Sequence, residues 1–354
     1  MTPGRASTVR HRLKPGATIP LALTMGEPAG IGPELALRAW LAREQACLAP
    51  FFVLADPDLL KTTARALGLA APTRRIETPR EAVDLFADAL PVLPIPLPSP
   101  VAPGRPDVAN ASAVIASIET ATSLALDGQA SAIVTNPIHK SVLYQGGFSF
   151  SGHTDFVASL CERKLGPDGS CKPVMMLACP GLRVVPVTVH IALSQVVGTL
   201  TRDLVIDCGR ITAQALARDF GIADPRLAVA GLNPHAGEGG AMGREEIEII
   251  EPAIDILRSE GISVAGPIPA DSLFHAAKRE SYDAVLCMYH DQALIPVKTI
   301  DFSNLVNVTL GLPVVRTSPG HGTALNIAGG GVADATSLIA AIEAAGNFAA
   351  QRAS

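Results

Sequence analysis

Three histidines of the chain could together bind a metal ion, because each follows an apolar run that is typical of a buried strand. They are His190 after residues 184–189, His235 after 227–232 and His290 after 284–288. Side chains at the C-terminal ends of neighbouring strands meet at one edge of an open α/β sheet. Three neutral imidazoles with an open fourth position form a catalytic metal site, best suited to zinc but able to take other divalent ions. The pattern predicts a metal centre if the three strands are neighbours.

The residues alone leave the choice of these three histidines open. His139, His153 and His321 also lie in predicted loops of the chain. A single loop histidine is more often a hydrogen-bonded structural residue than a metal ligand. Strand ends favour the first trio, but spacing by itself does not select it.

A second group of residues favours an anionic ligand. Lys298, Asn307 and Arg316 follow His290, and each is set in otherwise apolar sequence. Only 17% of the chain is charged, so two cations in such surroundings are conspicuous. Lysine and arginine bind phosphate and carboxylate groups through charge-assisted hydrogen bonds. The stretch 283–331 therefore predicts a site for a small anionic molecule beside a metal-capable imidazole.

Length and composition limit the class of protein. A chain of 354 residues is long enough for more than one domain, and 48% hydrophobic residues give it an aliphatic core. A formal net charge of -5 argues against a nucleic-acid partner. No uninterrupted apolar run is long enough for a membrane span. Six cysteines at irregular spacings, without a C-x-x-C pair, indicate reduced thiols and a cytoplasmic protein. The basic residues 1–18 predict a disordered tail.

Alternating strands and helices predict a mostly parallel sheet covered on both faces. The predicted strands are 20–24, 51–55, 132–135, 174–178, 184–189, 227–232, 264–269 and 284–288. The predicted helices are 33–44, 58–68, 81–90, 109–126, 204–220, 245–260 and 333–345, with another that starts near Phe156 and is capped by Thr154 or Asp155. The proline-rich segment 91–106 is expected to be extended along a domain edge. The glycine-rich loop 25–32 fits a plain turn and an anion-binding loop equally well.

Eight motifs distributed along the chain identify a resemblance to a known family. They are LALTMGEPAGIGPEL, IVTNPIHK, FSGHTDFVA, VTVHIAL, GLNPHAGEGGAMGREE, GPIPADSLF, YHDQALIPVK and RTSPGHGTALNIAG. With these motifs the chain resembles the 4-hydroxythreonine-4-phosphate dehydrogenases of vitamin B6 biosynthesis, over nearly its whole length from Pro20. The resemblance implies two α/β/α domains like those of isocitrate and isopropylmalate dehydrogenases. It places the active site in the interdomain cleft, at the interface of a homodimer. We expect a first domain from 19–142 and 316–354, and a second domain from 143–315 that carries the metal and substrate residues.

The resemblance also assigns roles to individual residues. It implies His190 and His235 from one subunit and His290 from the other as metal ligands. The implied substrate contacts are His153, Thr154, Lys298, Asn307 and Arg316. Asp271 and Asp291 are candidates for the group that accepts the hydroxyl proton. Asp291, beside His290, could equally orient that imidazole.

The implied reaction is a metal-dependent, NAD(P)-linked oxidation of 4-(phosphooxy)-L-threonine, followed by decarboxylation to 3-amino-2-oxopropyl phosphate. The divalent ion is expected to be Zn²⁺, with Mg²⁺ or Co²⁺ as alternatives. Relatives usually carry acidic residues where this chain has Gly320 and Asn326, near the expected nicotinamide nucleotide. The choice between NAD and NADP, and the cofactor-binding residues, therefore stay open.

Three other functions fit the same residues. The nearest is a paralogous dehydrogenase that acts on 4-phosphoerythronate, 4-phosphothreonate or an aromatic cis-dihydrodiol. A metal hydrolase built on the three histidines would need no nicotinamide cofactor. A non-catalytic ligand-binding protein would retain the site without turnover.

Overall fold

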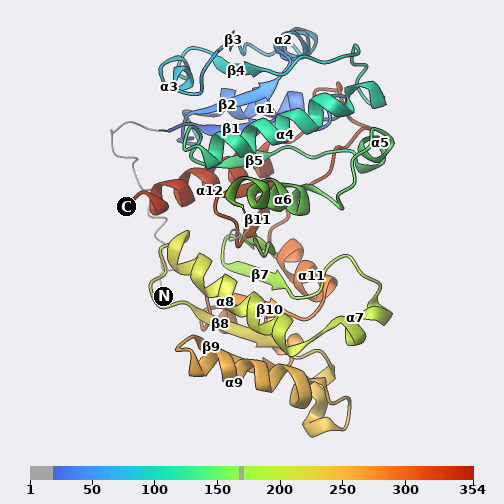
Figure 1. Ribbon diagram of the computed structural model, residues 1–354, viewed down its shortest axis with the longest axis vertical. Helices are drawn as coiled ribbons and strands as arrows, with labels where there is room; N and C mark the ends of the chain where they lie inside the picture. Colours follow the sequence, from blue (N-terminus) through green and yellow to red (C-terminus); the bar gives the residue numbers. More distant parts are fainter. Residues whose placement is uncertain (1–18, 167–170) are drawn as a thin grey trace, which may run out of the picture.

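The computed structural model describes residues 19–166 and 171–354 and contains one continuous sheet of twelve strands (Figure 1). The strands are β1 Leu21–Thr24, β2 Phe51–Ala55, β3 Thr73–Arg75, β4 Leu90–Pro94, β5 Ile133–Thr135, β6 Val174–Cys179, β7 Leu182–Pro186, β8 Arg226–Ala230, β9 Ser263–Ile268, β10 Ala284–Cys287, β11 Val306–Leu310 and β12 Arg316–Pro319. Their order in the sheet is β3-β4-β2-β1-β5-β12-β11-β6-β7-β10-β8-β9. The predicted tail 1–18 lies outside the described residues.

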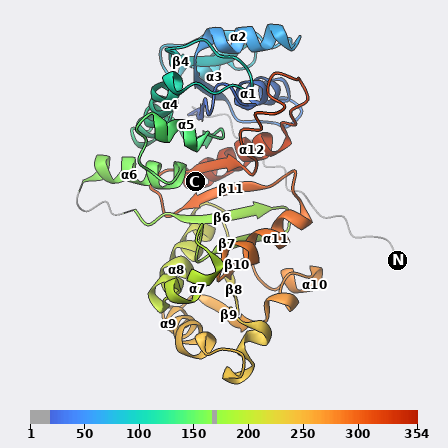
Figure 2. The ribbon, with the colours of Figure 1, turned by 90° about the vertical axis from the view of Figure 1, so that its right-hand side faces the viewer.

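Helices cover both faces of the sheet, as predicted (Figure 2). The longer ones are α1 Gly32–Leu41, α2 Pro57–Ala66, α4 Ala111–Leu126, α6 His153–Leu165, α8 Arg202–Arg218, α9 Glu251–Ser259, α11 His290–Ile300 and α12 Thr336–Arg352. The shorter ones are α3 Glu81–Leu85, α5 Lys140–Gln145, α7 Leu193–Thr199 and α10 Ala276–Arg279. There are also 3₁₀ segments η1 Val108–Asn110, η2 Pro234–Gly240 and η4 Ala270–Ser272, and a π-helical segment η3 Glu246–Ile250. None of the helices in the described residues is both long and apolar enough to cross a membrane.

The prediction of a mostly parallel sheet is confirmed. Only the pairs β6–β7, β6–β11 and β11–β12 are antiparallel among the described strands. The turn at Gly181, with φ of 84°, joins β6 to β7 as expected. β1, β2 and β10 are buried along their whole length. Strands covered on both faces read as continuous apolar runs, which is why these three could be found in the sequence.

Several predicted boundaries were wrong. The predicted helix 81–90 ends at Leu85, because Leu90 begins β4. The proline-rich segment is extended, but its first residues form β4, which lies between β2 and β3 instead of along an edge. No helix was predicted after His290, whereas α11 begins there and continues through Pro296. Neither Thr154 nor Asp155 caps α6, which begins at His153 after Gly152 with no side-chain cap.

The two predicted domains share one sheet in this structure. β5 pairs with β12, and β12 pairs with β11, so the hydrogen-bonded ladder is continuous between the two parts. The boundary predicted at residues 315–316 falls between β11 and β12. The division into two domains stays a prediction.

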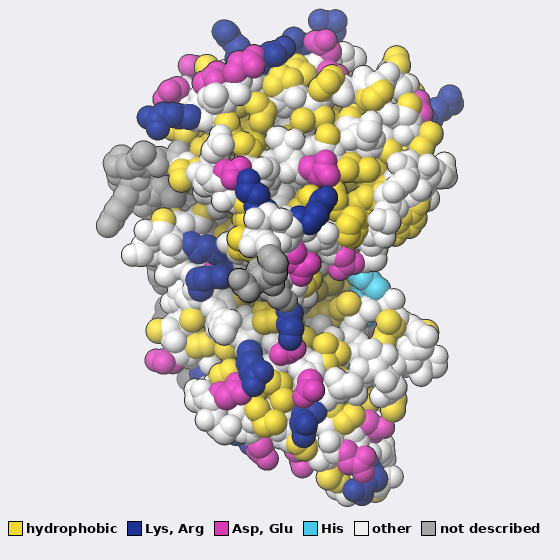
Figure 3. Space-filling view, in the orientation of Figure 1, with side chains coloured by type: hydrophobic (Ala, Val, Ile, Leu, Met, Phe, Trp, Pro, Cys, Tyr) yellow, Lys and Arg dark blue, Asp and Glu magenta, His cyan; other side chains and the backbone are white. Residues whose placement is uncertain are grey.

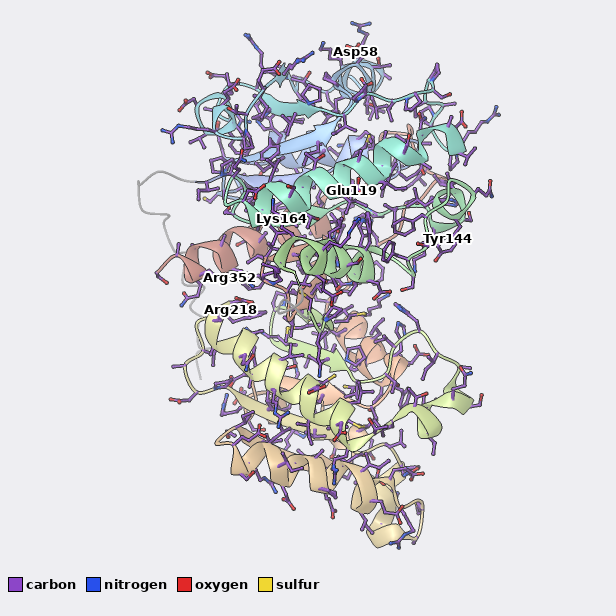
Figure 4. The ribbon with its side chains drawn as sticks, in the orientation of Figure 1. Asp58, Glu119, Tyr144, Lys164, Arg218 and Arg352 are labelled. Carbon is purple, nitrogen blue, oxygen red and sulfur yellow. The ribbon has the colours of Figure 1, made fainter. Side chains whose placement is uncertain are left out.

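A buried carboxylate at the end of α8 forms ion pairs that link this helix to the C-terminal helix α12. Asp219 follows α8 and is 5% exposed. Its two oxygens accept hydrogen bonds from the guanidinium groups of Arg218 and Arg352, at 2.7 and 3.0 Å from each. Figure 4 shows these two arginines on α8 and α12, on the same side of the molecule. The pair of ionic contacts thus joins the ends of two long helices.

We expect Asp219→Asn to lower the free energy of unfolding by about 3 kcal/mol, because it leaves two guanidinium groups without their anion. Burial raises the pKa of Asp219, but its hydrogen bonds and charge interactions with both arginines outweigh burial and hold the pKa below the usual value. The stabilisation by the Asp219 carboxylate is therefore complete above about pH 4, the pKa of an aspartate in the unfolded chain. It is lost as the pH falls through the lower pKa of Asp219 in the folded protein. Urea unfolding at several pH values measures this. A difference between wild type and variant that stays constant into strong acid would contradict it.

The control is Asp203→Asn. Asp203 lies in the first turn of the same helix, and its side chain is 85% exposed beside Arg202. A change of no more than about 0.5 kcal/mol is expected there.

Candidate active site

The three strands that precede the predicted metal ligands are neighbours in the sheet. β10 pairs in parallel with β7 on one side and with β8 on the other. His190 follows β7, His235 lies in η2 after β8, and His290 begins α11 after β10. The three strands are therefore neighbours, as the predicted metal centre requires. In Figure 3, histidine atoms are visible at the indentation between the upper and lower parts of the molecule.

His190 and His290 lie together within one chain. Their ring centroids are 5.6 Å apart, with an angle of 46° between the ring planes. Two imidazoles that bind one zinc ion tetrahedrally, with Zn–N distances near 2 Å, have ring centres roughly 5 Å apart. Partial burial lowers the pKa of His190, and the nearby charges of Lys140 and His290 lower it further. A neutral imidazole is the form that binds a metal, and the lowered pKa favours it in His190. The spacing of the two rings is compatible with two ligands of one ion.

Asp291 is hydrogen bonded to the ring of His290. The distance from His290 Nδ1 to Asp291 Oδ1 is 2.7 Å, and the carboxylate is largely exposed. A carboxylate on one ring nitrogen fixes the tautomer and directs the other nitrogen, here Nε2, toward a metal. The contact supports the orienting role considered for Asp291. A catalytic role for this residue stays a prediction.

His235 lies in a loop of unusual backbone conformation. Its φ is 51°, and the residues through Gly239 also have positive φ. The loop is held by Glu246, which is 1% exposed and accepts hydrogen bonds from the backbone N–H and the side-chain amide of Asn233. A Cβ at Gly237 would approach Glu246 Oε2 to 2.6 Å, so this tight loop requires glycine there.

Within one chain, no group of three or more histidine, cysteine or acidic side chains in the described residues is arranged to hold a metal ion. The pair that is already close is His190 with His290. The resemblance had placed His190 with His235 in one subunit and His290 in the other. That distribution between subunits stays a prediction, and the short distance between His190 and His290 is a finding about the single chain.

Arg316 forms the centre of the anion site. It is 3% exposed on β12, and its Nη1 and Nη2 donate to the hydroxyls of Thr309 and Thr135 at 2.9 and 2.6 Å. Its Nε has no hydrogen-bond partner, and no carboxylate among the described residues forms an ion pair with it. Burial lowers the pKa of Arg316 to about 10, so it remains a cation at neutral pH. A buried cation without an anion is costly, so this arrangement favours an anionic ligand.

His153 and Asn307 add two more unpaired polar atoms. His153 Nε2 and Asn307 Oδ1 are buried without hydrogen-bond partners. Thr309 stands opposite Arg316 in the β11–β12 register, and Asn307 opposite Ser318, so Asn307 and Arg316 share one face of the sheet. Burial, followed by the charges of Arg316 and Lys140, holds the pKa of His153 well below its usual value. Three predicted substrate residues thus have unused hydrogen-bonding capacity, which folded proteins rarely leave without a purpose.

The other two predicted substrate residues differ in position. Thr154 is half-buried in the first turn of α6, where backbone N–H groups have no partner within the helix. Lys298 lies in the last turn of α11, with its ammonium 5.8 Å from the centroid of the Phe302 ring. The hydrogen bonds and charge interactions of the described residues do not link Lys298 to His153 or Arg316. Its place in the site stays a prediction.

Lys140 was missed as a site residue. It begins α5, shortly after β5, and its charge acts on both His153 and His190. Its charge therefore acts on one residue of the anion site and on one of the histidine pair. The motif IVTNPIHK contains it at the end of a predicted strand, and that position was the available signal.

Asp271 lies in η4, which contacts η2, the segment that carries His235. Its side chain is exposed and forms no hydrogen bond or ion pair with the described residues. A role for Asp271 as the proton acceptor stays a prediction.

The glycine-rich loop packs against the segment 320–324. Ile31 N–H donates to the Thr323 carbonyl at 3.1 Å, and a Cβ at Gly30 would approach the same carbonyl to 2.9 Å. Glu27, 2% exposed, accepts a hydrogen bond from Ala29 N–H within this loop. Burial raises the pKa of Glu27 despite that hydrogen bond. The sequence did not indicate this buried acid.

Packing explains why this chain has glycine at position 320, where relatives usually have an acidic residue. A Cβ at residue 320 would come within 2.8 Å of Leu305 Cδ2, so Leu305 fills the space that a side chain would need. Asn326 is exposed in the following loop.

Open α/β sheets bind ligands at the carboxyl ends of their strands, and the His190–His290 pair lies at such strand ends here. The chain belongs to the family of pyridoxal phosphate biosynthetic protein PdxA, whose family model matches residues 46–345. This confirms the resemblance found in the sequence and places the chain among the oxidoreductases.

Two curated relatives are similar over nearly their whole length. The 4-hydroxythreonine-4-phosphate dehydrogenase of Caulobacter vibrioides is 54% identical over 333 residues, covering 94% of this chain and 98% of the relative. The enzyme of the same name from Bradyrhizobium diazoefficiens is 50% identical over 345 residues, covering 95% and 99%.

Solved structures of proteins with related names have a similar fold. A 4-hydroxythreonine-4-phosphate dehydrogenase from Klebsiella pneumoniae superimposes with a TM-score of 0.82 and 36% identity, covering 94% of this chain and all of that chain. A terephthalate 1,2-cis-dihydrodiol dehydrogenase from Burkholderia xenovorans gives a TM-score of 0.62 and 29% identity, covering 91% and 96%.

Proposed function

We propose that this chain catalyses the NAD(P)-dependent oxidation of 4-(phosphooxy)-L-threonine at its C3 hydroxyl. Decarboxylation of the resulting 3-keto acid gives 3-amino-2-oxopropyl phosphate, a step toward pyridoxal phosphate. The observation that carries this proposal is the buried Arg316, which has a free Nε and no anionic partner among the described residues, together with the close pair His190 and His290. Lys140 acts electrostatically on His153 and on His190. A phosphate site beside a metal-capable pair is what this substrate requires. The names of the relatives support the same substrate.

His190, His235 and His290 would hold the divalent ion, which we propose to be Zn²⁺, with Mg²⁺ or Co²⁺ as alternatives. A bound ion would act as a Lewis acid that lowers the pKa of a coordinated hydroxyl and stabilises negative charge on oxygen. Asp291 contributes by fixing the His290 ring through their 2.7 Å contact. The fit of the His190–His290 pair to a shared ion supports this assignment.

Arg316, His153 and the open N-terminus of α6 would bind the substrate phosphate. Arg316 offers its free Nε, and the first turn of α6 offers backbone N–H groups together with the Thr154 hydroxyl. Asn307, on the same face as Arg316, and Lys298 would contact other polar groups of the substrate. These contacts orient C3 toward the cofactor, which is how positioning lowers the barrier.

Asp271 is the proposed acceptor of the hydroxyl proton. Asp291 is engaged with His290, whereas Asp271 has no hydrogen bond or ion pair within the described residues. The same carboxyl could then return a proton to the carbon that loses carbon dioxide.

The nicotinamide cofactor would lie along the loop 25–32 and the facing segment 320–327. A backbone hydrogen bond from Ile31 N–H to the Thr323 carbonyl joins these segments, and His321 Nε2 is buried without a hydrogen-bond partner. The preference for NAD or NADP would be set in this region.

We also propose that the enzyme works in the cytoplasm as a homodimer with shared active sites. Apolar side chains are exposed on the segments next to the histidine pair: Leu193 on α7 is 70% exposed, and Ile295 on α11 is 64% exposed. Phe302, two residues beyond the end of α11, is 61% exposed. A second copy that covers these residues would bury apolar surface at the mouth of the site.

The proposed function predicts a strict requirement for nicotinamide cofactor. With metal and NAD or NADP present, we expect kcat/KM for 4-(phosphooxy)-L-threonine to exceed that for 4-phosphoerythronate, 4-phosphothreonate or an aromatic cis-dihydrodiol by at least about 100-fold. Following NADH or NADPH formation with each substrate in parallel measures this. A dihydrodiol as the best substrate would instead favour the paralogous dehydrogenase, to which the Burkholderia xenovorans structure is similar. Turnover without nicotinamide would favour a hydrolase, and no turnover a binding protein.

A further inference from the structure

Lys140 is a cation of the site without any assigned role. It is exposed at the start of α5, and its ammonium forms no hydrogen bond or ion pair with any described residue. Its charge depresses the pKa of His153 and of His190. Lys140 thus places a positive charge near His153, on which Arg316 also acts, and an anion bound there would interact favourably with both cations.

The neighbouring acidic group does not neutralise Lys140. Asp155, in the first turn of α6, acts on His190 and is hydrogen bonded to the Ser151 hydroxyl. It forms no ion pair with Lys140. The ammonium is therefore left for a ligand.

Gly152 keeps the space beside this ammonium open. Its φ of 170° is extended and is accessible to any residue, so the backbone does not require glycine there. A Cβ at residue 152 would have only the Lys140 side chain nearby, at 3.5 Å from Cε and 3.6 Å from Nζ. Gly152 is also the residue that precedes α6, so Lys140 lies over the N-terminus of that helix.

We propose that Lys140 is a further substrate-binding residue, whose ammonium contacts the phosphate group held by Arg316, His153 and the N-terminus of α6. The inference rests on the proposed function in that the phosphate is taken to be the substrate's. Phosphate is favoured over carboxylate because these donors come from three separate elements, β12, α5 and α6. A dianion with three free oxygens can accept from all of them at once, whereas a planar carboxylate has two.

The test uses inorganic phosphate as the probe and needs no turnover. Calorimetric titration of the full-length protein with phosphate is expected to show a dissociation constant at least about 10-fold higher for Lys140→Met than for wild type. Lys140→Arg should recover most of the affinity. The matched control is Lys61→Met, because Lys61 is an exposed lysine on α2 paired with Asp58, and phosphate affinity should stay within about twofold.

Phosphate binding by Lys140→Met with wild-type affinity would overturn the proposal, as would a wild-type protein that binds no phosphate. An unchanged urea unfolding midpoint excludes loss of folding as the cause of weaker binding. This test of Lys140 can succeed or fail independently of the proposed function. A Lys140-dependent phosphate site in a protein that does not oxidise 4-(phosphooxy)-L-threonine would leave this inference standing and reject the substrate.

Discussion

His290→Ala is expected to lower kcat/KM by more than about 100-fold, beyond the range for losing a residue that only orients a ligand. The substitution removes one imidazole of the pair whose ring centroids are 5.6 Å apart, and with it the partner of Asp291. Metal content should fall in parallel, because two imidazoles cannot replace a three-ligand site. Steady-state kinetics at saturating metal, together with metal analysis of the purified protein, measure both effects.

His275→Ala is the matched control for this prediction. His275 is an exposed histidine that precedes α10, outside the site, and its loss should change neither metal content nor turnover. If His290→Ala kept its metal and its activity, the histidine trio would not be the metal centre. An intermediate loss in Asp291→Asn, of about 10- to 100-fold, would show that the carboxylate acts by orienting His290.

Arg316→Met is expected to separate activity from stability. The substrate loses a buried cationic partner, which costs about 4 kcal/mol or roughly 1000-fold in kcat/KM. The folded protein without substrate loses a desolvated charge that has no anion, and this gain offsets the loss of the hydrogen bonds to Thr309 and Thr135. Its free energy of unfolding should therefore change little. Kinetics and urea unfolding of the same preparations measure the two effects.

Phosphate provides a second readout for the arginine. It should stabilise the wild type against urea through binding to the folded state, and should lose this effect in Arg316→Met. The control Arg210→Met removes an exposed arginine that pairs with Glu260 on the surface, and it should leave kcat/KM unchanged. A strongly destabilised Arg316→Met variant would mean that the guanidinium has a structural role, contrary to the account given above.

Much of the fold could be predicted because the fully buried strands are short, continuous apolar runs, which are easily recognised in the sequence. β1, β2 and β10 are continuous apolar runs, and each was placed within a residue or two. The order of the strands was not accessible in the same way. The β7–β10–β8 adjacency joins segments far apart in the chain, so the sequence could state only what would follow if they were neighbours.

The errors at α6 and α11 have physical causes. A proline usually ends a helix, yet α11 continues through Pro296 because Ala293, Leu294 and Val297 are buried and hold it by packing. A side-chain cap was expected for α6, but Gly152 supplies none, and the first N–H groups remain free. The expected side-chain cap is missing at the helix N-terminus whose free N–H groups we propose to bind the ligand.

The site was predictable in its residue types but not in its electrostatics. His153, Asn307 and Arg316 were chosen by resemblance, and the structure adds that each has a buried polar atom without a partner. Lys140 gains its importance only from its position over α6, and Glu27 only from its burial. Both properties depend on tertiary contacts that no local pattern contains.

The most direct test of the central claim follows the carboxylate carbon of the substrate. With 4-(phosphooxy)-L-threonine labelled at that carbon, metal and oxidised nicotinamide cofactor, the account predicts labelled carbon dioxide in equimolar amount with reduced cofactor, and unlabelled 3-amino-2-oxopropyl phosphate. Reduced cofactor without labelled carbon dioxide would contradict the coupling of oxidation to decarboxylation. Labelled carbon dioxide without reduced cofactor would contradict the oxidation itself.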